Sequence, residues 1–397
     1  MRVLSSIAVA ACVVFSPPAG ARPGENAKAP PLSPRLAALQ KDLQAGKPGA
    51  LQAFWDGLKH APLVEPIPAE PHYLHVTFVW RAKDGDRNLA VACPLNFDKA
   101  ADGRMERLED TDLWYKTYRV RDDSRMRYRF VSLPPAAESG KPAPLTDDSS
   151  RPSPRPDPLN PAPKLPSGSP GVFSVVEMPA AVPPKWTVRH DGVPAGKLTS
   201  TRFKSQILGN ERDISVYTPP GYSKDGAPCH LLIVFDRSQY IADSFAPTPV
   251  ILDNLAAEGK IPPTVAVFIG NVNRSKELPC NDMFADFLAK ELVPHIRAEY
   301  RVTDKPEHTV VAGASYGGLA SSFAALRHPE VFGSVLSQSG SYWWGKPDEE
   351  EFEWLTRQFV TSPKLPVRFY IDVGLWEGGI NKMLPVAVRI ASPRTVA

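Results

Sequence analysis

The chain has 397 residues, of which 43% are apolar, and this length is enough for two or three domains. Its 46 Lys and Arg residues nearly balance its 43 Asp and Glu residues, so the formal net charge is only +3. This balance argues against nucleic acid or an anionic membrane surface as a partner.

The first residues have the arrangement of a secretory signal peptide. Arg2 provides a positive charge, residues 3–15 are mostly apolar but too short to span a bilayer, and Ala19-Gly20-Ala21 resembles a cleavage site. The alternative, a lipoprotein-like cleavage box ending at Cys12, is less favoured because the apolar run continues beyond it. We therefore predict a signal peptide over residues 1–21 and a periplasmic or secreted protein. No later segment predicts a membrane span.

Three cysteines follow the signal peptide: Cys93, Cys229 and Cys280. Because the number is odd, at least one remains unpaired within the chain, and the spacing does not select a disulfide. No Cys-x-x-Cys or His-rich spacing indicates a metal site, and no cofactor is expected.

Residues 22–70 are predicted to form an N-terminal arm, and residues 71–133 a small β-sandwich. In the arm, Leu36, Leu39 and Leu43 recur at helical spacing, and a second such group, separated from the first by Gly46-Lys47-Pro48-Gly49, includes Phe54. The sandwich is predicted from short runs that alternate or are rich in strand-forming residues. These runs are residues 74–80, 89–93, 114–120 and 126–131.

Residues 134–193 are rich in Pro, Ser and Asp, and we predict an extended linker with one docking strand at residues 172–176. From residue 194 strands alternate with helices, which predicts an α/β domain with a mostly parallel sheet over residues 194–397. A helix over residues 282–300 should be kinked by Pro294. The expected strands are residues 212–217, 230–235, 264–269, 309–313, 331–336 and 367–372.

Gly313-Ala314-Ser315-Tyr316-Gly317 lies between a predicted strand and a predicted helix, as in the nucleophile elbow of α/β-hydrolases. In such a turn the serine hydroxyl projects above the sheet, which makes Ser315 the candidate nucleophile. The backbone N–H of Tyr316 is one candidate donor to an oxyanion. The second is the N–H of Arg237 or Ser238, after an earlier strand.

The acid of the triad should follow a later strand, where Asp372 and Glu377 both lie. We favour Glu377, because it lies in the loop beyond the strand. The histidine should come last, but the only histidine after Ser315 is His328, for which a solvent-facing role is expected. The sequence therefore predicts an α/β-hydrolase domain that is short of its last strand and helix, with activity impaired by the missing base.

Several longer motifs resemble the enterochelin esterases, which hydrolyse the trilactone of catecholate siderophores. The similarity begins near Leu51 and covers most of the chain, including its β-rich region. The segments that carry it are LLIVFD, TPVILDNLAAEGKIPP, NRSKELPCNDMFADFLAKELVPHIRAEY, TVVAGASYGGLASSFAALRHPEVFGSVLSQSGSYWW, FYIDVGLWE, TFVW, DLWYKTYRV, RYRF and DPLNP.

The resemblance implies a carboxylic-ester hydrolase with Ser315 as nucleophile and a small-molecule ester, such as a catecholate siderophore, as substrate. Arg274 is then a candidate contact for an anionic catecholate, and Trp343 and Trp344 are candidate pocket residues. Three alternatives remain open: an esterase acting on carbohydrate-linked acyl groups, a catalytically inactive catecholate-binding protein, and a non-functional gene product.

Overall fold

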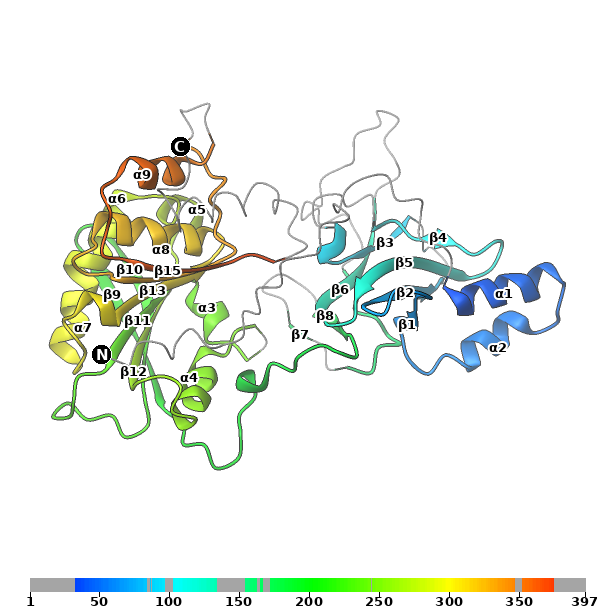
Figure 1. The fold of residues 1–397 in the computed structure, drawn as a ribbon, viewed down its shortest axis with the longest axis horizontal. Coiled ribbons are helices and arrows are strands. Elements are labelled where there is room, and N and C mark those ends of the chain that lie inside the picture. Colours follow the sequence, from blue (N-terminus) through cyan, green and yellow to red (C-terminus); the bar gives the residue numbers. More distant parts are fainter. Residues whose placement is uncertain are drawn as a thin grey trace. The chain divides into compact units, whose positions relative to one another are not determined.

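A computed structural model describes residues 33–83, 86, 88–96, 103–133, 154–162, 165–166, 172–243, 245–346 and 352–374. These residues form two compact units, which meet in sequence between Pro183 and Pro184. We call them the N-terminal unit and the C-terminal unit (Figure 1). None of the helices in the described residues is both long and apolar enough to cross a membrane.

The N-terminal unit contains two four-stranded antiparallel sheets. One sheet has the order β1-β2-β5-β4 and the other has the order β3-β6-β8-β7. The rings of Phe78 and Tyr128 lie 4.6 Å apart, and those of Trp80 and Phe130 lie 4.9 Å apart, so aromatic side chains of the two sheets share one core. The strands are β1 Leu63–Pro66, β2 Tyr73–Arg81, β3 Leu89–Ala92, β4 Glu106–Arg107, β5 Leu113–Arg121, β6 Arg125–Ser132, β7 Leu165–Pro166 and β8 Val172–Glu177. The β-sandwich expected from the sequence is confirmed.

Two helices predicted in the arm are present as α1 (Pro34–Gln44) and α2 (Ala50–Asp56). They bury Leu36, Leu39 and Phe54 in one cluster with Val79 of β2 and Leu113 of β5, so the arm packs against the sandwich. A short 3₁₀ turn, η1 (Pro94–Asn96), follows β3.

The predicted linker is corrected in part by the structure. The expected strand is present as β8 and pairs with β6, and residues 157–160 (DPLN) pack beneath it. Tyr128 donates a hydrogen bond to Asp157 Oδ2 at 2.6 Å, and Asn160 donates to the Val175 carbonyl at 2.8 Å. Residues 157–160 are thus part of the sandwich core and not of a linker. The side chains of Asp157 and Asn160 make hydrogen bonds to the buried Tyr128 hydroxyl and the Val175 carbonyl.

The C-terminal unit is built on a seven-stranded sheet with the order β15-β14-β13-β11-β12-β10-β9. The five strands from β15 to β12 are parallel, whereas β10 and β9 are antiparallel additions at one edge. The strands are β9 Lys197–Ser205, β10 Asn210–Thr218, β11 His230–Val234, β12 Thr264–Ile269, β13 Thr309–Ala314, β14 Ser334–Gln338 and β15 Arg368–Asp372. This is the α/β architecture that the sequence predicts.

Helices cover both faces of this sheet (Figure 1). Because neighbouring side chains of a strand point to opposite faces, Leu231 and Ile233 of β11 contact one layer, and Leu232 and Val234 contact the other. The helical elements are η3 Lys185–Thr187, α3 Arg237–Tyr240, α4 Thr248–Ala257, α5 Arg274–Glu277, α6 Asp282–Asp286, η4 Phe287–Leu292, α7 Val293–Glu299, η5 Pro306–His308, α8 Tyr316–Arg327 and α9 Trp354–Thr361.

The helix predicted over residues 282–300 is present but not uniform. A π-helical stretch, η4, separates α6 from α7, immediately before Pro294. Since proline lacks an N–H and crowds the preceding turn, the wider π turn accommodates it where the sequence predicted a kink.

Cys93, Cys229 and Cys280 are all buried and free. Burial raises the pKa of the Cys93 thiol to about 11, so this thiol stays protonated at neutral pH. The residues that the structure describes therefore contain three separate thiols where the sequence left one disulfide open.

Candidate active site

Ser315 occupies a sharp turn between β13 and α8, with φ 57° and ψ −122°. A positive φ is rare for residues other than glycine, asparagine and aspartate. Surrounding hydrogen bonds hold the Ser315 backbone in this conformation. The Ser315 N–H donates to the Gln338 carbonyl at 3.0 Å, and the Ser315 carbonyl accepts from the N–H groups of Leu319 and Ser341, each at 3.1 Å. This strand–turn–helix geometry is that of a nucleophile elbow.

Glycines allow the elbow to close. A Cβ atom on Gly313 would lie 2.8 Å from the Gly317 carbonyl carbon, and one on Gly318 would lie 2.6 Å from Ser337 Oγ. A Cβ on Gly317 would make only an ordinary contact, 3.4 Å from Asp236 Oδ2. The first glycine of the motif is therefore required by close backbone approach, and Gly318, one position beyond the motif, is equally restricted.

Two sets of backbone N–H groups lie at the same edge of the sheet as Ser315. Tyr316 begins α8, and Arg237 begins α3 directly after β11, the parallel neighbour of β13. N–H groups in the first turn of a helix have no acceptor within that helix, so they can donate to an oxyanion. Asp236, with φ 56° and ψ 49°, turns the chain from β11 into α3.

Arg274 is fixed beside the elbow by a buried carboxylate. Its Nε and Nη2 donate to Asp236 Oδ1 and Oδ2 at 2.7 and 2.8 Å, and Nη2 also donates to the Ala314 carbonyl at 3.3 Å. Asn271 Nδ2 donates to Asp236 Oδ1 at 2.5 Å. The hydrogen bonds to Asp236 raise the pKa of the Arg274 guanidinium, against the opposing effect of burial. The sequence did not indicate this pair, which joins residues 38 positions apart.

Aromatic rings continue from Arg274 along one side of the elbow. The Arg274 guanidinium carbon lies 5.7 Å from the Tyr316 ring centroid, and the Tyr316 and Trp343 rings lie 6.1 Å apart. Trp343 is 43% exposed, so much of its ring faces solvent. Trp344, in contrast, packs edge-on against Trp354 at 6.2 Å. The structure thus separates the two tryptophans: Trp343 joins the aromatic row, whereas Trp344 takes part in packing.

Of the two acid candidates, Asp372 ends β15, and its Oδ1 accepts a hydrogen bond from the Ser339 N–H at 3.1 Å. Its own carbonyl accepts from the same N–H at 3.0 Å. Asp372 therefore has a role in holding the loop after β14. Glu377 lies outside the described residues.

His328 is not a solvent-facing residue, as the sequence suggested, because it is only 8% exposed. Its Nδ1 and Nε2 lie 2.9 and 2.8 Å from carboxylate oxygens of Glu330 and Asp286. His328 follows the last residue of the 12-residue helix α8, which places it roughly 18 Å from Ser315 at about 1.5 Å per residue. It cannot reach the Ser315 hydroxyl from there.

All eight histidines of the chain fall within the described residues. In the C-terminal unit, His230 and His308 stack at 4.3 Å where β11 and β13 begin, His295 lies against Phe203, and His190 bonds to the Lys185 carbonyl. Within the part of the chain that the structure describes, the Ser315 hydroxyl contacts the Ser341 hydroxyl, with the two Oγ atoms 3.1 Å apart. Ser341 was not predicted from the sequence, where its closeness to the end of β14 is the one signal.

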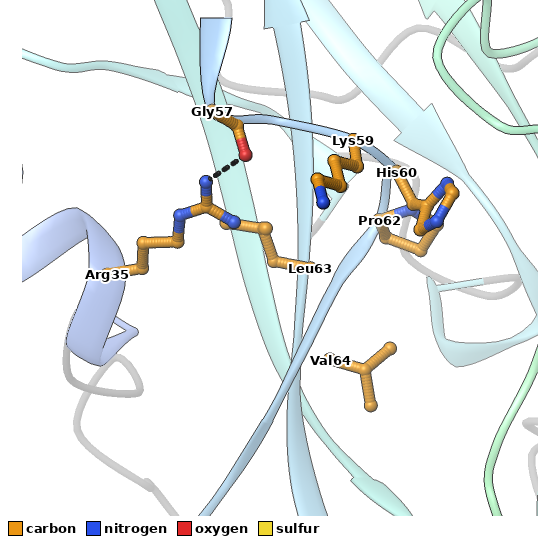
Figure 2. A pocket seen from close by; sticks show the side chains of 7 residues that line it. All are labelled: Arg35, Gly57, Lys59, His60, Pro62, Leu63 and Val64. Carbon is orange, nitrogen blue, oxygen red and sulfur yellow. Dashed lines mark hydrogen bonds between the residues drawn. The ribbon is translucent and has the colours of Figure 1, made fainter. Parts of the chain in front are cut away.

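A hollow in the N-terminal unit is lined by Arg35, Lys59, His60 and Val64, among others (Figure 2). Arg35 Nη2 donates a hydrogen bond to the Gly57 carbonyl at 2.6 Å, which is the dashed line in Figure 2. None of the residues that the sequence predicts for catalysis or substrate binding lines this hollow.

Comparison with known proteins gives matches to both units. Residues 205–394 match a family described as putative esterase, and residues 75–187 match the enterochelin esterase N-terminal family. An iron(III) enterobactin esterase of Dickeya dadantii is 32% identical over 340 residues, covering 78% of this chain and 74% of the relative. An iron(III) salmochelin esterase of Escherichia coli is 28% identical, covering 86% of each.

Solved structures agree with these sequence matches. The enterobactin esterase of Shigella flexneri, crystallised in the presence of enterobactin, is 26% identical, with a TM-score of 0.66 over 86% of this chain and 90% of that chain. A ferric enterobactin esterase of Salmonella typhimurium has the same TM-score and identity, over 86% of this chain and 89% of that chain.

Proposed function

Because the chain belongs to the enterochelin esterase family, we propose that it hydrolyses ester bonds of a catecholate siderophore with Ser315 as the nucleophile. The observation that carries this proposal is the strained elbow at Ser315, with first-turn N–H groups of α8 and α3 at the same sheet edge. Strain of this kind persists where the surroundings maintain it, and it is concentrated at functional sites.

In the proposed reaction the Ser315 oxygen attacks the ester carbonyl carbon while a base takes the hydroxyl proton. The carbonyl oxygen becomes an oxyanion, which the N–H of Tyr316 and that of Arg237 or Ser238 stabilise. The carbon–oxygen bond to the leaving alcohol then breaks, and water hydrolyses the acyl-enzyme to release the acid and restore Ser315. Glu377 remains the proposed acid of the triad.

The row formed by Arg274, Tyr316 and Trp343 supports an aromatic, anionic acyl group. A catecholate presents a flat ring and negative oxygens, which suit a tryptophan face and a guanidinium. Since Nε and Nη2 of Arg274 are engaged with Asp236, Nη1 is the group left to meet the substrate. The Shigella flexneri relative was also crystallised in the presence of 2,3-dihydroxy-N-benzoyl-serine, whose dihydroxybenzoyl ring is a catechol.

A second candidate function is binding of the catecholate without turnover. The contacts of the described histidines support it, because the five in the C-terminal unit each contact a group other than Ser315. Loss of a triad base lowers serine hydrolase rates by several orders of magnitude. Both candidate functions predict that the protein binds the catecholate, but only the first predicts that it hydrolyses the ester.

We further propose that the protein is exported and acts in the periplasm or outside the cell. The support is the order of charge, apolar run and small-residue site in residues 1–21. Mass spectrometry of the mature N-terminus after expression in a Gram-negative host tests this directly: removal of about 21 residues agrees with the proposal, and retention of Met1 in a cytoplasmic fraction contradicts it.

The function is tested by measuring hydrolysis and binding on the same preparations. We expect 4-nitrophenyl acetate and a 2,3-dihydroxybenzoyl-serine ester to be hydrolysed, and Ser315→Ala to abolish this while still binding the catecholate. Ser334→Ala is the matched control, since its hydroxyl bonds to the Glu307 carbonyl at the far end of β14. Catecholate binding with no turnover in any variant establishes the second candidate. Equal turnover in parent and Ser315→Ala excludes Ser315 as nucleophile.

A further inference from the structure

Ser341 is tied to Ser315 at two points. Its backbone N–H donates to the Ser315 carbonyl, and its hydroxyl oxygen lies 3.1 Å from the Ser315 hydroxyl oxygen. The Ser341 side chain is almost fully buried, at 3% exposure. The atom that would carry out nucleophilic attack therefore has a fixed hydroxyl as its neighbour.

The loop that presents Ser341 is itself rigidly held. Ser339 has a positive φ of 46° and donates its N–H to the carbonyl and carboxylate of Asp372. Gly340 has no room for a side chain, because a Cβ there would lie 2.5 Å from Ser337 Oγ. Tyr342, 1% exposed, joins the Ser337 and Ser322 hydroxyls, at 2.8 and 2.7 Å. Constraints on both sides of Ser341 leave its hydroxyl little freedom to move away.

We propose that Ser341 is a positioning residue that orients the Ser315 hydroxyl and donates a hydrogen bond to its oxygen as negative charge develops there. A donor to the charged form of a group favours that form and lowers its pKa. Ser341 is buried whereas Ser315 is exposed, so water also reaches the Ser315 oxygen, and the Ser341 hydroxyl adds one donor whose position is fixed by the fold. The proposal rests on the proposed function only in taking Ser315 as the nucleophile.

The test replaces the nucleophile with a titratable thiol, so that it needs no ester turnover. In a Ser315→Cys background, the rate of iodoacetamide alkylation is measured against pH to obtain the pKa of the new thiol. Alkylation joins the thiolate sulfur to carbon and releases iodide, so the rate follows the thiolate fraction. The parent chain is alkylated in parallel to subtract Cys93, Cys229 and Cys280, whose burial raises their pKa values.

Adding Ser341→Ala should raise the thiol pKa by roughly one pH unit and slow alkylation at neutral pH several-fold, because a donor to the thiolate is lost. Ser341→Thr, which keeps the hydroxyl, should leave the pKa near that of Ser315→Cys alone. Ser341→Gly provides a second hydroxyl-free variant if Ser341→Ala fails to fold. Ser322→Ala is the matched control, because it removes a buried hydroxyl that bonds to Tyr342.

An unchanged thiol pKa in the folded hydroxyl-free variants overturns the proposal, as does an equal rise in Ser322→Ala. Either result would leave Ser341 with a role only in the shape of the loop. The thiol pKa can be measured even if the parent chain does not hydrolyse esters. The outcome for Ser341 is therefore independent of the outcome for the proposed esterase activity.

Discussion

Arg274 donates to both carboxylate oxygens of Asp236, at 2.7 and 2.8 Å, and thereby joins the end of β11 to the turn that contains Ser315. Asp236 is 4% exposed, whereas the Arg274 side chain is 35% exposed. The carboxylate is thus a buried charge whose compensation comes from one partly solvated arginine and Asn271.

Replacing Asp236 with alanine should destabilise the C-terminal unit by about 2 kcal/mol, which is less than for a fully buried pair because water reaches Arg274. Urea unfolding measures the change. The control is Asp213→Ala, whose partner Arg202 lies 3.5 Å away and whose carboxylate is 55% exposed, so we expect less than about 0.5 kcal/mol. Similar losses in the two variants would contradict a special role for Asp236.

Gly313→Ala should open the elbow, because its Cβ would lie 2.8 Å from backbone atoms of Gly317 that cannot move aside. We expect a loss of about 2 kcal/mol in unfolding free energy. Gly317→Ala is the comparison: its Cβ meets Asp236 Oδ2 at 3.4 Å, and alanine favours the helix by up to about 1 kcal/mol. Thermal melting should therefore rank Gly313→Ala clearly below Gly317→Ala; the reverse order would refute the steric account.

Tyr128→Phe should cost the N-terminal unit about 2 kcal/mol, because it removes a donor from the fully buried Asp157 carboxylate. Burial, followed by the Asp157 charge, raises the pKa of Tyr128, so the phenol remains a donor across the accessible pH range. Tyr115→Phe removes an equivalent contact to Glu106 in a more exposed setting and should cost less than about 0.5 kcal/mol. Denaturant melts followed by tryptophan fluorescence distinguish these outcomes.

The stacked pair His230 and His308 should make the C-terminal unit sensitive to acid. Burial, followed by the charge of His308, lowers the pKa of His230 below its usual 6.5. Between the lowered pKa and 6.5, the unfolded chain therefore binds a proton that the folded chain does not. The unfolding free energy should fall as pH drops below 6.5, with a slope of at most about 1.4 kcal/mol per pH unit from this residue. In His230→Phe this part of the slope should disappear; an unchanged pH profile would exclude His230 as its source.

The elements found from the sequence are those with a regular local pattern. The buried strand β11 is a continuous apolar run, and apolar residues alternate along β2, so both were predicted. Alternation predicts one buried face, but β2 is buried on both faces from His75 to Trp80. The edge strand β9 was missed because eight of its nine residues are at least partly exposed and mostly polar. The strand expected at residues 331–336 instead begins at Ser334, because Phe332 reaches the core from the preceding loop.

At the site, the elbow was predictable because strand, turn and helix are contiguous in the chain. The pairing of Asp236 with Arg274 and the contact of Ser341 with Ser315 were not, because each depends on which loops the sheet order brings together. His328 was expected at the surface, but two carboxylates from different segments hold it at 8% exposure. Only the folded chain brings Asp286 of α6 next to the end of α8.

The three buried thiols have a practical consequence for preparing the protein. Since Cys93, Cys229 and Cys280 are free in the folded chain, recovery of the described units from denaturant needs no oxidant and no disulfide isomerase. Reductant in the buffer should leave the melting temperature unchanged, and an oxidising refolding mixture is the harmful choice, because it can trap cross-linked chains before the thiols are enclosed.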